Sequence, residues 1–283
     1  MAQAEMHGKI CLVTGANAGI GKATATALAR RGATVVMVCR DQARGEAAMA
    51  EVRAESGNGS VTLLLADLAS QASIRCLAST VQETCPRFHV LINNAGVARW
   101  RRSVTAEGIE TMFAVNYLAP FLLTNLLIER LKESAPARII NVASAQHHPL
   151  DFADLQHQKR FSGVRAYGRS KFAMMLFTYE LAKRLQGTGV TVNCLSPGVA
   201  ATNLARDMPL PFRLMTRLLF GSPENAAQTS LYLASSPAVA GITGKYFDRC
   251  KEAKTSAKTC DTAASQRLWD ISATLTQLTV ADR

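Results

Sequence analysis

The sequence lacks three features that would place it among membrane, secreted or metal-binding proteins. No run approaches the roughly 20 consecutive apolar residues of a membrane-spanning helix. Residues 1–7 have neither the basic nor the apolar region of a signal peptide, so we do not expect secretion. No group of cysteines and histidines has zinc-ligand spacing, and we predict no metal site.

Disulfide and nucleic-acid-binding patterns are also missing. The seven cysteines are scattered, and Cys11, Cys39 and Cys194 lie inside apolar runs. This favours reduced thiols and a cytoplasmic location. The net charge of +11 favours anionic partners. Because no helix-turn-helix, RNA-recognition or zinc-finger pattern occurs, we predict no nucleic-acid partner. Peripheral contact with a membrane and a homodimeric state are left open.

What the sequence does contain is a strand, a glycine turn and a helix start within residues 9–21. The run 10–13 is apolar and partly β-branched, and Gly15, Gly19 and Gly21 remove side chains where the backbone must turn. The helix that follows directs its unpaired N–H groups at that turn, which suits an anionic diphosphate. Such a turn can also serve packing alone, so further signals are needed.

Strand-like runs recur along the chain, with helical stretches between most of them. We expect strands at 10–13, 34–39, 61–65, 90–92, 138–142, 190–195 and 244–247, and helical segments at 41–55, 106–132 and 166–185. This alternation predicts an α/β fold, a single doubly wound Rossmann domain over residues 1–283 with a mainly parallel seven-stranded sheet.

In such sheets the ligand lies beyond the carboxyl ends of the strands. Those ends are Thr14-Gly15, Arg40, Asp67, Asn93-Asn94-Ala95-Gly96, Ser144 and Ser196-Pro197-Gly198. Each alone is also typical of an ordinary turn. Six in register favour one shared binding site.

Arg40 bears on the choice of cofactor. A guanidinium suits a 2′-phosphate better than a bare ribose, so it predicts NADP(H), with Lys22 adding positive charge nearby. Alternatively, Arg40 is solvated and Asp41 merely caps the next helix. Asp67 either accepts from the adenine amino group or caps the helix before Ser70.

Tyr167 and Lys171 lie four positions apart on a predicted helix, and therefore on one face. A phenol is a poor acid or base at pH 7, and a neighbouring ammonium lowers its pKa. Ser144 is placed to hold a carbonyl oxygen. Such a Tyr–Lys pair by itself more often marks a solvated helix face.

As a set, these motifs resemble the short-chain dehydrogenase/reductase family. The matching elements, in family order, are Thr14-Gly15-x3-Gly19-x-Gly21, Asp67-Leu68, Asn93-Asn94-Ala95-Gly96, Asn116, Ser144, Tyr167-x3-Lys171 and Pro197-Gly198-x3-Thr202. Within the family the chain is most similar to the retinol dehydrogenase group, through residues 39–41, 120–125, 145–148 and 244–247 and the long gap between Ser144 and Tyr167.

The resemblance implies an NADP-dependent enzyme that interconverts a lipophilic, retinal-like aldehyde or ketone and its alcohol. Tyr167 would exchange the proton, Ser144 would orient the oxygen, Lys171 would lower the tyrosine pKa and hold the nicotinamide ribose, and Asn116 would support a proton relay. The implied cofactor-binding residues are Gly15, Asn17, Gly19, Ile20, Gly21, Arg40, Asp67, Leu68, Asn94, Ala95, Gly96, Tyr167, Lys171, Pro197, Gly198 and Thr202. His147 and His148 are expected to be bystanders.

Two departures from the group keep alternatives open. Its membrane-bound members carry an apolar anchor before the dinucleotide fold, whereas the first predicted strand here begins near residue 10, and Ala143 replaces a frequent second serine. The alternatives are a soluble carbonyl reductase with a non-retinoid substrate and a non-catalytic, cofactor-sensing protein on the same fold.

Residues 199–222 are apolar and interrupted by Arg206, Arg213 and Arg217. They predict a mobile substrate lid that rests against anionic lipid. The other interpretation is a helix packed on the domain edge.

Overall fold

The computed structural model describes residues 6–198, 221–256, 259 and 261–278. Its centre is an eight-stranded sheet of order β3-β2-β1-β4-β5-β6-β7-β8. The strands are β1 (Ile10–Thr14), β2 (Thr34–Cys39), β3 (Val61–Leu65), β4 (Val90–Asn93), β5 (Ala137–Val142), β6 (Val190–Ser196), β7 (Lys245–Asp248) and β8 (Lys251–Glu252). Strands β1 to β7 pair in parallel, and β8 pairs antiparallel with β7. The predicted doubly wound α/β Rossmann fold is confirmed.

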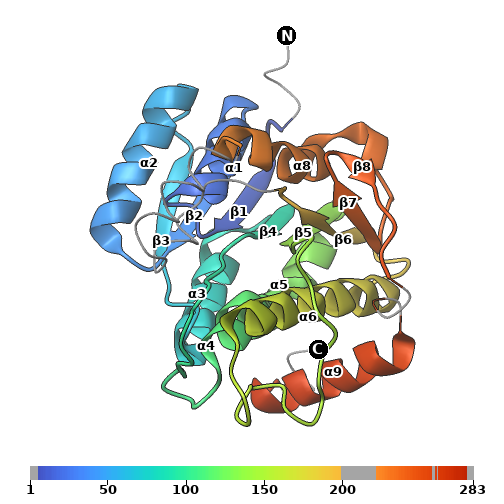
Figure 1. Ribbon diagram of the computed structural model, residues 1–283. Helices are drawn as coiled ribbons and strands as arrows, with labels where there is room; N and C mark the ends of the chain where they lie inside the picture. The colour runs from blue at the N-terminus through green and yellow to red at the C-terminus, as the bar shows by residue number, and fades with distance from the viewer. Residues whose placement is uncertain (1–5, 199–220, 257–258, 260, 279–283) are drawn as a thin grey trace.

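Helices cover both faces of this sheet (Figure 1). One face carries α1 (Gly19–Arg30), α2 (Gln42–Ser56) and α8 (Pro223–Ser235), and the other carries α3 (Gln71–Thr84), α5 (Ala119–Glu133) and α6 (Gly163–Arg184), with α9 (Thr262–Leu275) packed on α6. Strand β1 shows why both faces are covered: Cys11 and Val13 point into one buried cluster, and Leu12 points into the other. Alternating side chains of a parallel strand thus serve two cores.

The sheet has one strand more than predicted. After β7 the chain reverses through Arg249 and Cys250, whose φ angles of 47° and 60° are both left-handed. A two-residue hairpin turn requires this conformation at both central positions. The resulting β8 has two exposed residues, so it carries no hydrophobic period by which the sequence could indicate it.

The helix predicted over 106–132 begins later and is interrupted. Its first turn is α4 (Thr111–Phe113), whose N–H groups at Met112 and Phe113 donate to the Glu110 carboxylate at 3.0 and 2.8 Å. A π-helical stretch, η1 (Ala114–Leu118), then precedes α5. Hydrophobic spacing does not distinguish a π turn from an α turn, and π turns are frequent at functional sites.

The segment Thr111–Glu133 is long and apolar enough to span a membrane, with a mean hydropathy of 1.5, although we expected no such run. In the structure 89% of the 18-residue stretch with this mean hydropathy is buried inside the protein. Its apolar side chains pack against the sheet and the neighbouring helices, as those of a core helix do.

Strands β1 and β4 are adjacent in the sheet, although β2 and β3 separate them along the chain. The connections leave these two strands in opposite directions, which opens a crevice beyond their carboxyl ends. The predicted strand-end residues meet along this edge.

Candidate active site

The glycine turn after β1 is packed so closely that side chains are excluded. Gly15 has a φ of 67°, and a Cβ on it would lie 2.9 Å from the Cα of Ala95. A Cβ on Gly21 would overlap the Gly15 carbonyl oxygen and the Asn94 side chain. Gly19 also has a left-handed φ, of 55°. The turn, the start of α1 and the loop after β4 therefore touch through backbone, as a cradle for a diphosphate requires.

The start of α1 leaves its N–H groups open. Its N-cap, Ala18, makes no side-chain capping bond, and its first turn contains no acidic residue. By contrast, α2, α3, α8 and α9 begin with a residue whose side chain accepts from the first turn: Asp41, Ser70, Ser222 and Asp261. The open donors of α1 fit the anionic diphosphate of a nicotinamide dinucleotide. Asn17 and Ile20 are half-buried in this turn.

Thr14 ties the two loops of the crevice together. Its Oγ1 accepts from the backbone N–H groups of Asn94 and Ala95, both at 3.0 Å, and the Asn94 amide donates to the Thr14 carbonyl at 2.8 Å. Gly96 follows, half-buried. This role of Thr14 could not be predicted from the sequence, because a threonine at a strand end is common and its partners lie about 80 positions away.

At the nucleotide end of the crevice, Arg40 is exposed immediately after β2. Asp41 caps α2 by accepting from the N–H of Arg44 at 2.9 Å. Asp67 accepts from the N–H of Ala69 at 3.0 Å, while Ser70 caps α3, so Asp67 is not the helix cap. Leu68 is half-buried beside it. The roles of Arg40, Asp67 and Leu68 toward a nucleotide remain predictions.

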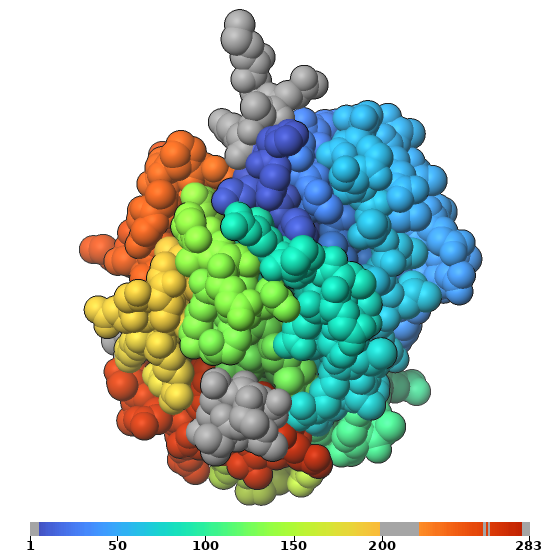
Figure 2. Space-filling view, turned by 180° about the vertical axis from the view of Figure 1, so that it is seen from behind, coloured from blue at the N-terminus to red at the C-terminus, as the bar shows by residue number. Residues whose placement is uncertain are grey.

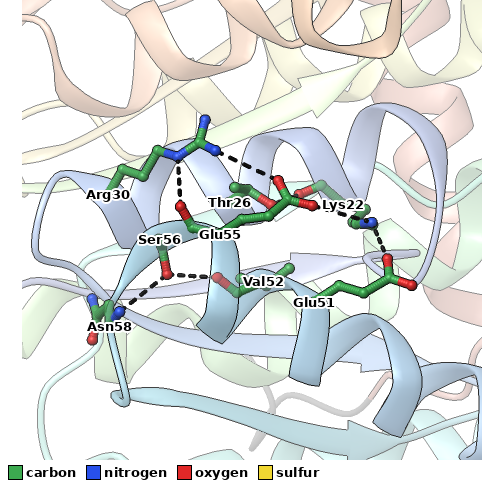
Figure 3. A network of polar contacts seen from close by, with 8 residues as sticks. All are labelled: Lys22, Thr26, Arg30, Glu51, Val52, Glu55, Ser56 and Asn58. Atoms are coloured by element: carbon green, nitrogen blue, oxygen red, sulfur yellow. Dashed lines mark hydrogen bonds and ion pairs between the residues drawn. The ribbon is translucent and has the colours of Figure 1, made fainter.

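The Lys22 side chain forms ion pairs with the neighbouring helix α2. Its ammonium pairs with Glu51 and lies 3.7 Å from Glu55, both on α2, where Glu55 also pairs with Arg30 at 3.5 Å (Figure 3). The hydrogen bond that Lys22 donates to Glu51 raises the pKa of Lys22. Its charge is thus balanced within the protein, and the expectation that it adds free positive charge for a phosphate is corrected.

The proposed chemical end of the crevice lies where β5 meets α6. Tyr167 and Lys171 share one face of α6, and the Ser144 side chain, just after β5, hydrogen-bonds to Tyr167. The buried Lys171 Nζ donates to the carbonyl oxygen of Val142 at 2.8 Å and lies 5.8 Å from the centre of the Tyr167 ring. Two hydroxyls and one ammonium therefore converge.

Burial controls the protonation of this group. It raises the pKa of Tyr167 above its ordinary value, opposed by the hydrogen bond from Ser144, and it lowers the pKa of Lys171 to about 8. Both shifts arise because removal from water penalises the charged form of each group. The expected lowering of the tyrosine pKa by Lys171 stays a prediction.

Asn116 lies in the π-helical stretch and is fully buried. Its side chain donates to the Val97 carbonyl at 2.9 Å and accepts from the Val97 N–H at 2.7 Å. It also donates to Ser170 Oγ at 3.0 Å, and that hydroxyl donates to the Tyr167 carbonyl at 2.7 Å. Ser170, which went unmarked in the sequence, therefore joins Asn116 to the tyrosine. Its position three residues after Tyr167 was the available signal.

The loop after Ser144 rests on α6. His148 donates its N–H to the Gly168 carbonyl at 3.2 Å, and a Cβ on Gly168 would overlap its ring. His147 Nδ1 lies 3.4 Å from the Ser144 carbonyl oxygen. Both histidines thus contact the loop or helix that carries a predicted catalytic residue.

At the end of β6, Pro197 is half-buried and Gly198 is exposed with a φ of 73°. Both border a cavity of about 220 Å³ that α8 and the β7–β8 turn close. None of the four predicted catalytic residues lines it. Thr202 and the predicted lid, apart from its last two residues, lie outside the described residues. Within the described ranges, no three His, Cys, Asp or Glu side chains could hold a metal ion.

Comparison with known proteins agrees with this geometry. The chain is 45% identical to retinol dehydrogenase 14 of Homo sapiens over 288 residues, which cover 94% of this chain and 86% of that protein. Among solved structures, an uncharacterized protein from Mycobacterium Paratuberculosis superposes with a TM-score of 0.79 at 32% identity, over 96% of this chain and 94% of that one.

The Pseudomonas aeruginosa RhlG/NADP active-site complex gives a TM-score of 0.70 at 30% identity, over 87% of this chain and 97% of that one. The family model described as short chain dehydrogenase matches residues 9–210. The chain therefore belongs to the short-chain dehydrogenase family of oxidoreductases and is retinol dehydrogenase-like within it.

Proposed function

We propose that the protein is an NADP-dependent oxidoreductase that interconverts a lipophilic aldehyde or ketone and the corresponding alcohol. The observation that carries this proposal is the grouping of Tyr167 with Ser144, whose side chain hydrogen-bonds to it, and with Lys171, whose buried Nζ lies 5.8 Å from the centre of the Tyr167 ring. Two hydroxyls from different elements, held together, can both contact one carbonyl oxygen.

The bound nicotinamide cofactor supplies the hydride, and the chain's own residues handle the proton and the geometry. At pH 7 Tyr167 is a neutral phenol, since the ordinary pKa of 10.0 is already well above 7 and burial raises the pKa of this residue further. In the reducing direction its hydroxyl donates the proton to the substrate oxygen, while Ser144 fixes that oxygen by a second hydrogen bond. Asn116, through Ser170, holds the backbone of the helix turn that carries Tyr167.

NADP preference is supported by two observations. Arg40 is exposed at the end of β2, and the adjacent carboxylate of Asp41 is occupied as the cap of α2. The related RhlG protein is described as an NADP complex. Steady-state kinetics with NADPH and NADH test this preference. Equal use of both cofactors would show that Arg40 does not bind a 2′-phosphate.

A retinal-like substrate is supported by the 45% identity to retinol dehydrogenase 14. The test incubates purified protein and NADPH with retinal, medium- and long-chain aldehydes, short polar aldehydes and ketones. A lower KM for the lipophilic compounds is expected, with residues 199–222 as the proposed lid. Preference for short ketones would favour the soluble carbonyl reductase, and absence of turnover on every compound would favour a cofactor-sensing protein.

We also propose a cytoplasmic location. All six cysteines within the described residues are free thiols, which is typical of a reducing compartment. Fractionation of cells that produce the protein tests this location. A homodimer remains a prediction, to be measured by light scattering of the purified protein.

A further inference from the structure

Two loops beside the proposed active site form an exposed surface that is both basic and apolar. We call it the basic rim, and it consists of Trp100, Arg101, Arg102, Val104, Lys159, Arg160, Val164 and Arg165. Trp100, Val104 and Val164 are three of the four large apolar side chains that are most exposed in the described structure, at 50%, 48% and 42%.

The two loops lie side by side. Arg102 Nε donates to the Gln156 carbonyl at 3.1 Å, and a Cβ on Gly163 would lie 3.2 Å from the Trp100 Cα. Both ends of the stretch between Gln156 and Gly163 therefore contact the residues around Trp100, and Lys159 and Arg160 lie within that stretch. In Figure 1 these are the teal-green and yellow-green loops below α4 and α6.

The positive charge of the rim is only partly compensated. Its loops, residues 100–104 and 158–165, contain five arginines and lysines and no acidic residue. Coulombic attraction links Glu110 to Arg102 and Asp154 to Lys159, and Asp151 pairs with Arg169 at 3.6 Å. Arg101, Arg160 and Arg165 have no such carboxylate partner among the described residues. Glu107 accepts from the N–H of Gln71 at 2.9 Å.

We propose that the basic rim is a docking surface for anionic phospholipid membranes. An exposed tryptophan between arginines suits the interface between headgroups and acyl chains, and the surrounding cations gain from the negative surface potential. A protein or nucleic-acid partner would explain the charge equally well. The lipid surface is favoured because the exposed apolar side chains are spread over two loops and alternate with the cations, as a headgroup interface requires.

The rim also borders the proposed site. Val97, three positions before Trp100, bonds to Asn116, and Val164 and Arg165 lie in the first turn of α6, just before Tyr167. Docking through the rim would bring the proposed site close to the bilayer, in which a lipophilic substrate dissolves. That purpose rests on the proposed function, whereas vesicle binding is measured without any turnover.

The test uses the full chain and vesicles of phosphatidylcholine with or without about 30% phosphatidylserine. The chain has two tryptophans, and Trp269 is 4% exposed, so a change in tryptophan fluorescence on binding reports Trp100. We expect sedimentation with the anionic vesicles, a blue shift of the emission, and loss of both as salt is raised.

Two variants separate the rim from net charge. Arg160→Gln with Arg165→Gln should lower partitioning about 30-fold, at about 1 kcal/mol for each charge near the surface. The control, Lys9→Gln with Arg87→Gln, removes the same charge at the amino ends of β1 and β4, the opposite edge of the sheet, and should leave partitioning within about twofold. Trp100→Ala should abolish the blue shift and weaken binding, with circular dichroism verifying the fold of each variant.

Several outcomes would overturn the proposal: no binding to anionic vesicles, an equal loss in the control variant, or vesicle binding that the rim substitutions leave unchanged. The last result would place the contact elsewhere. Rim-dependent binding of single-stranded DNA or of an acidic peptide without vesicle binding would assign the surface to that other partner. None of these results depends on whether the protein turns over retinal, so failure here and failure of the proposed function are distinguishable.

Discussion

Two lysines at opposite ends of the crevice show how differently the fold treats the same side chain. Lys171, at the chemical end, is 3% exposed, and burial lowers its pKa to about 8. Lys22, at the nucleotide end, is partly exposed and paired with Glu51, which raises its pKa. Burial of the Lys171 ammonium reduces the stability of the fold, whereas water screens the more exposed charge of Lys22. Substitutions should therefore change rate and stability at the first end, and selectivity at the second.

The largest effect is expected from Tyr167→Phe, at the buried end. Loss of the hydroxyl removes the proton donor, so turnover should fall by about 10²–10⁴-fold. Cofactor affinity should stay within a few-fold, because the hydroxyl is aimed at the substrate oxygen. Single-turnover assays and fluorescence titration with NADPH measure the two quantities. Near-normal turnover would refute the assignment of the site.

Lys171→Met should change stability in a way that depends on pH. The amine has an ordinary pKa of 10.5 in the unfolded chain and about 8 in the fold, so the unfolded chain binds more protons between those values. This group therefore makes the free energy of unfolding rise by about 3 kcal/mol between pH 8 and 10.5. Below pH 8 the amine is charged in both states, and its burial lowers the free energy of unfolding by that full amount. Urea denaturation should show that rise in the native protein and lose it in the variant.

A matched control for that experiment is Lys183→Met. Lys183 is an exposed lysine near the end of the same helix and donates to Thr262 Oγ1 at 2.9 Å. The Lys183→Met variant should leave the pH dependence of the free energy of unfolding unchanged. Lys171→Met should also reduce both cofactor affinity and rate, and a variant with normal kinetics would show that the buried ammonium acts on neither.

Arg40→Asp tests the exposed end. If Arg40 holds the 2′-phosphate, the native protein prefers NADPH by about 1.5–3 kcal/mol, and the substitution narrows or reverses that preference. Turnover with saturating cofactor should change little, because Arg40 lies at the nucleotide end. The ratio of kcat/KM for NADPH and NADH measures the effect. An unchanged ratio would mean that Arg40 is only a solvated side chain.

The smallest effect is expected from Glu51→Gln. The Lys22–Glu51 pair is exposed, so its loss should cost less than about 1 kcal/mol and diminish further at high salt. Released from Glu51, Lys22 keeps only the longer contact with Glu55 at 3.7 Å and can approach an anion more readily, so NADPH affinity should rise slightly. Thermal unfolding and NADPH titration at low and high salt measure these changes. A fall in affinity would show that the pair supports the cofactor site as it stands.

Much of this crevice could be predicted because its signals are local. Gly15 and Gly21 mark a turn by their own conformational freedom, and the six strand ends follow from short apolar runs. The partners that set the charges were not predictable in the same way. Lys22 finds Glu51 on another helix, 29 positions away, and the pKa of Tyr167 depends on how deeply the folded chain buries it.

The basic rim was hidden for a related reason. Residues 99–102 form too short a run to indicate a surface, and the loop around Lys159 and Arg160 that completes it lies about 60 positions later in the chain. Only the contacts of Gln156 and Gly163 show that the two belong together.

The final helix, α9, closes the outer side of the molecule. Figure 2 shows this C-terminal segment, in red, along the lower edge near the cyan of α3. Trp269 packs edge-on against Phe121 and in a tilted arrangement against Phe177, at ring-centre distances of 5.0 and 5.9 Å. Arg75 of α3 donates to the Thr276 carbonyl at 2.8 Å.

During synthesis, α5 and α6 leave the ribosome well before this cover exists. Nearly 80 residues separate the end of α6 from the start of α9, which is a delay of roughly 4–16 s at ordinary elongation rates. During that interval Trp269 does not yet cover the aromatic side chains of α5 and α6, and chaperones or another nascent chain can bind them. The packing of α5 and α6 is therefore completed only once α9 has been synthesised.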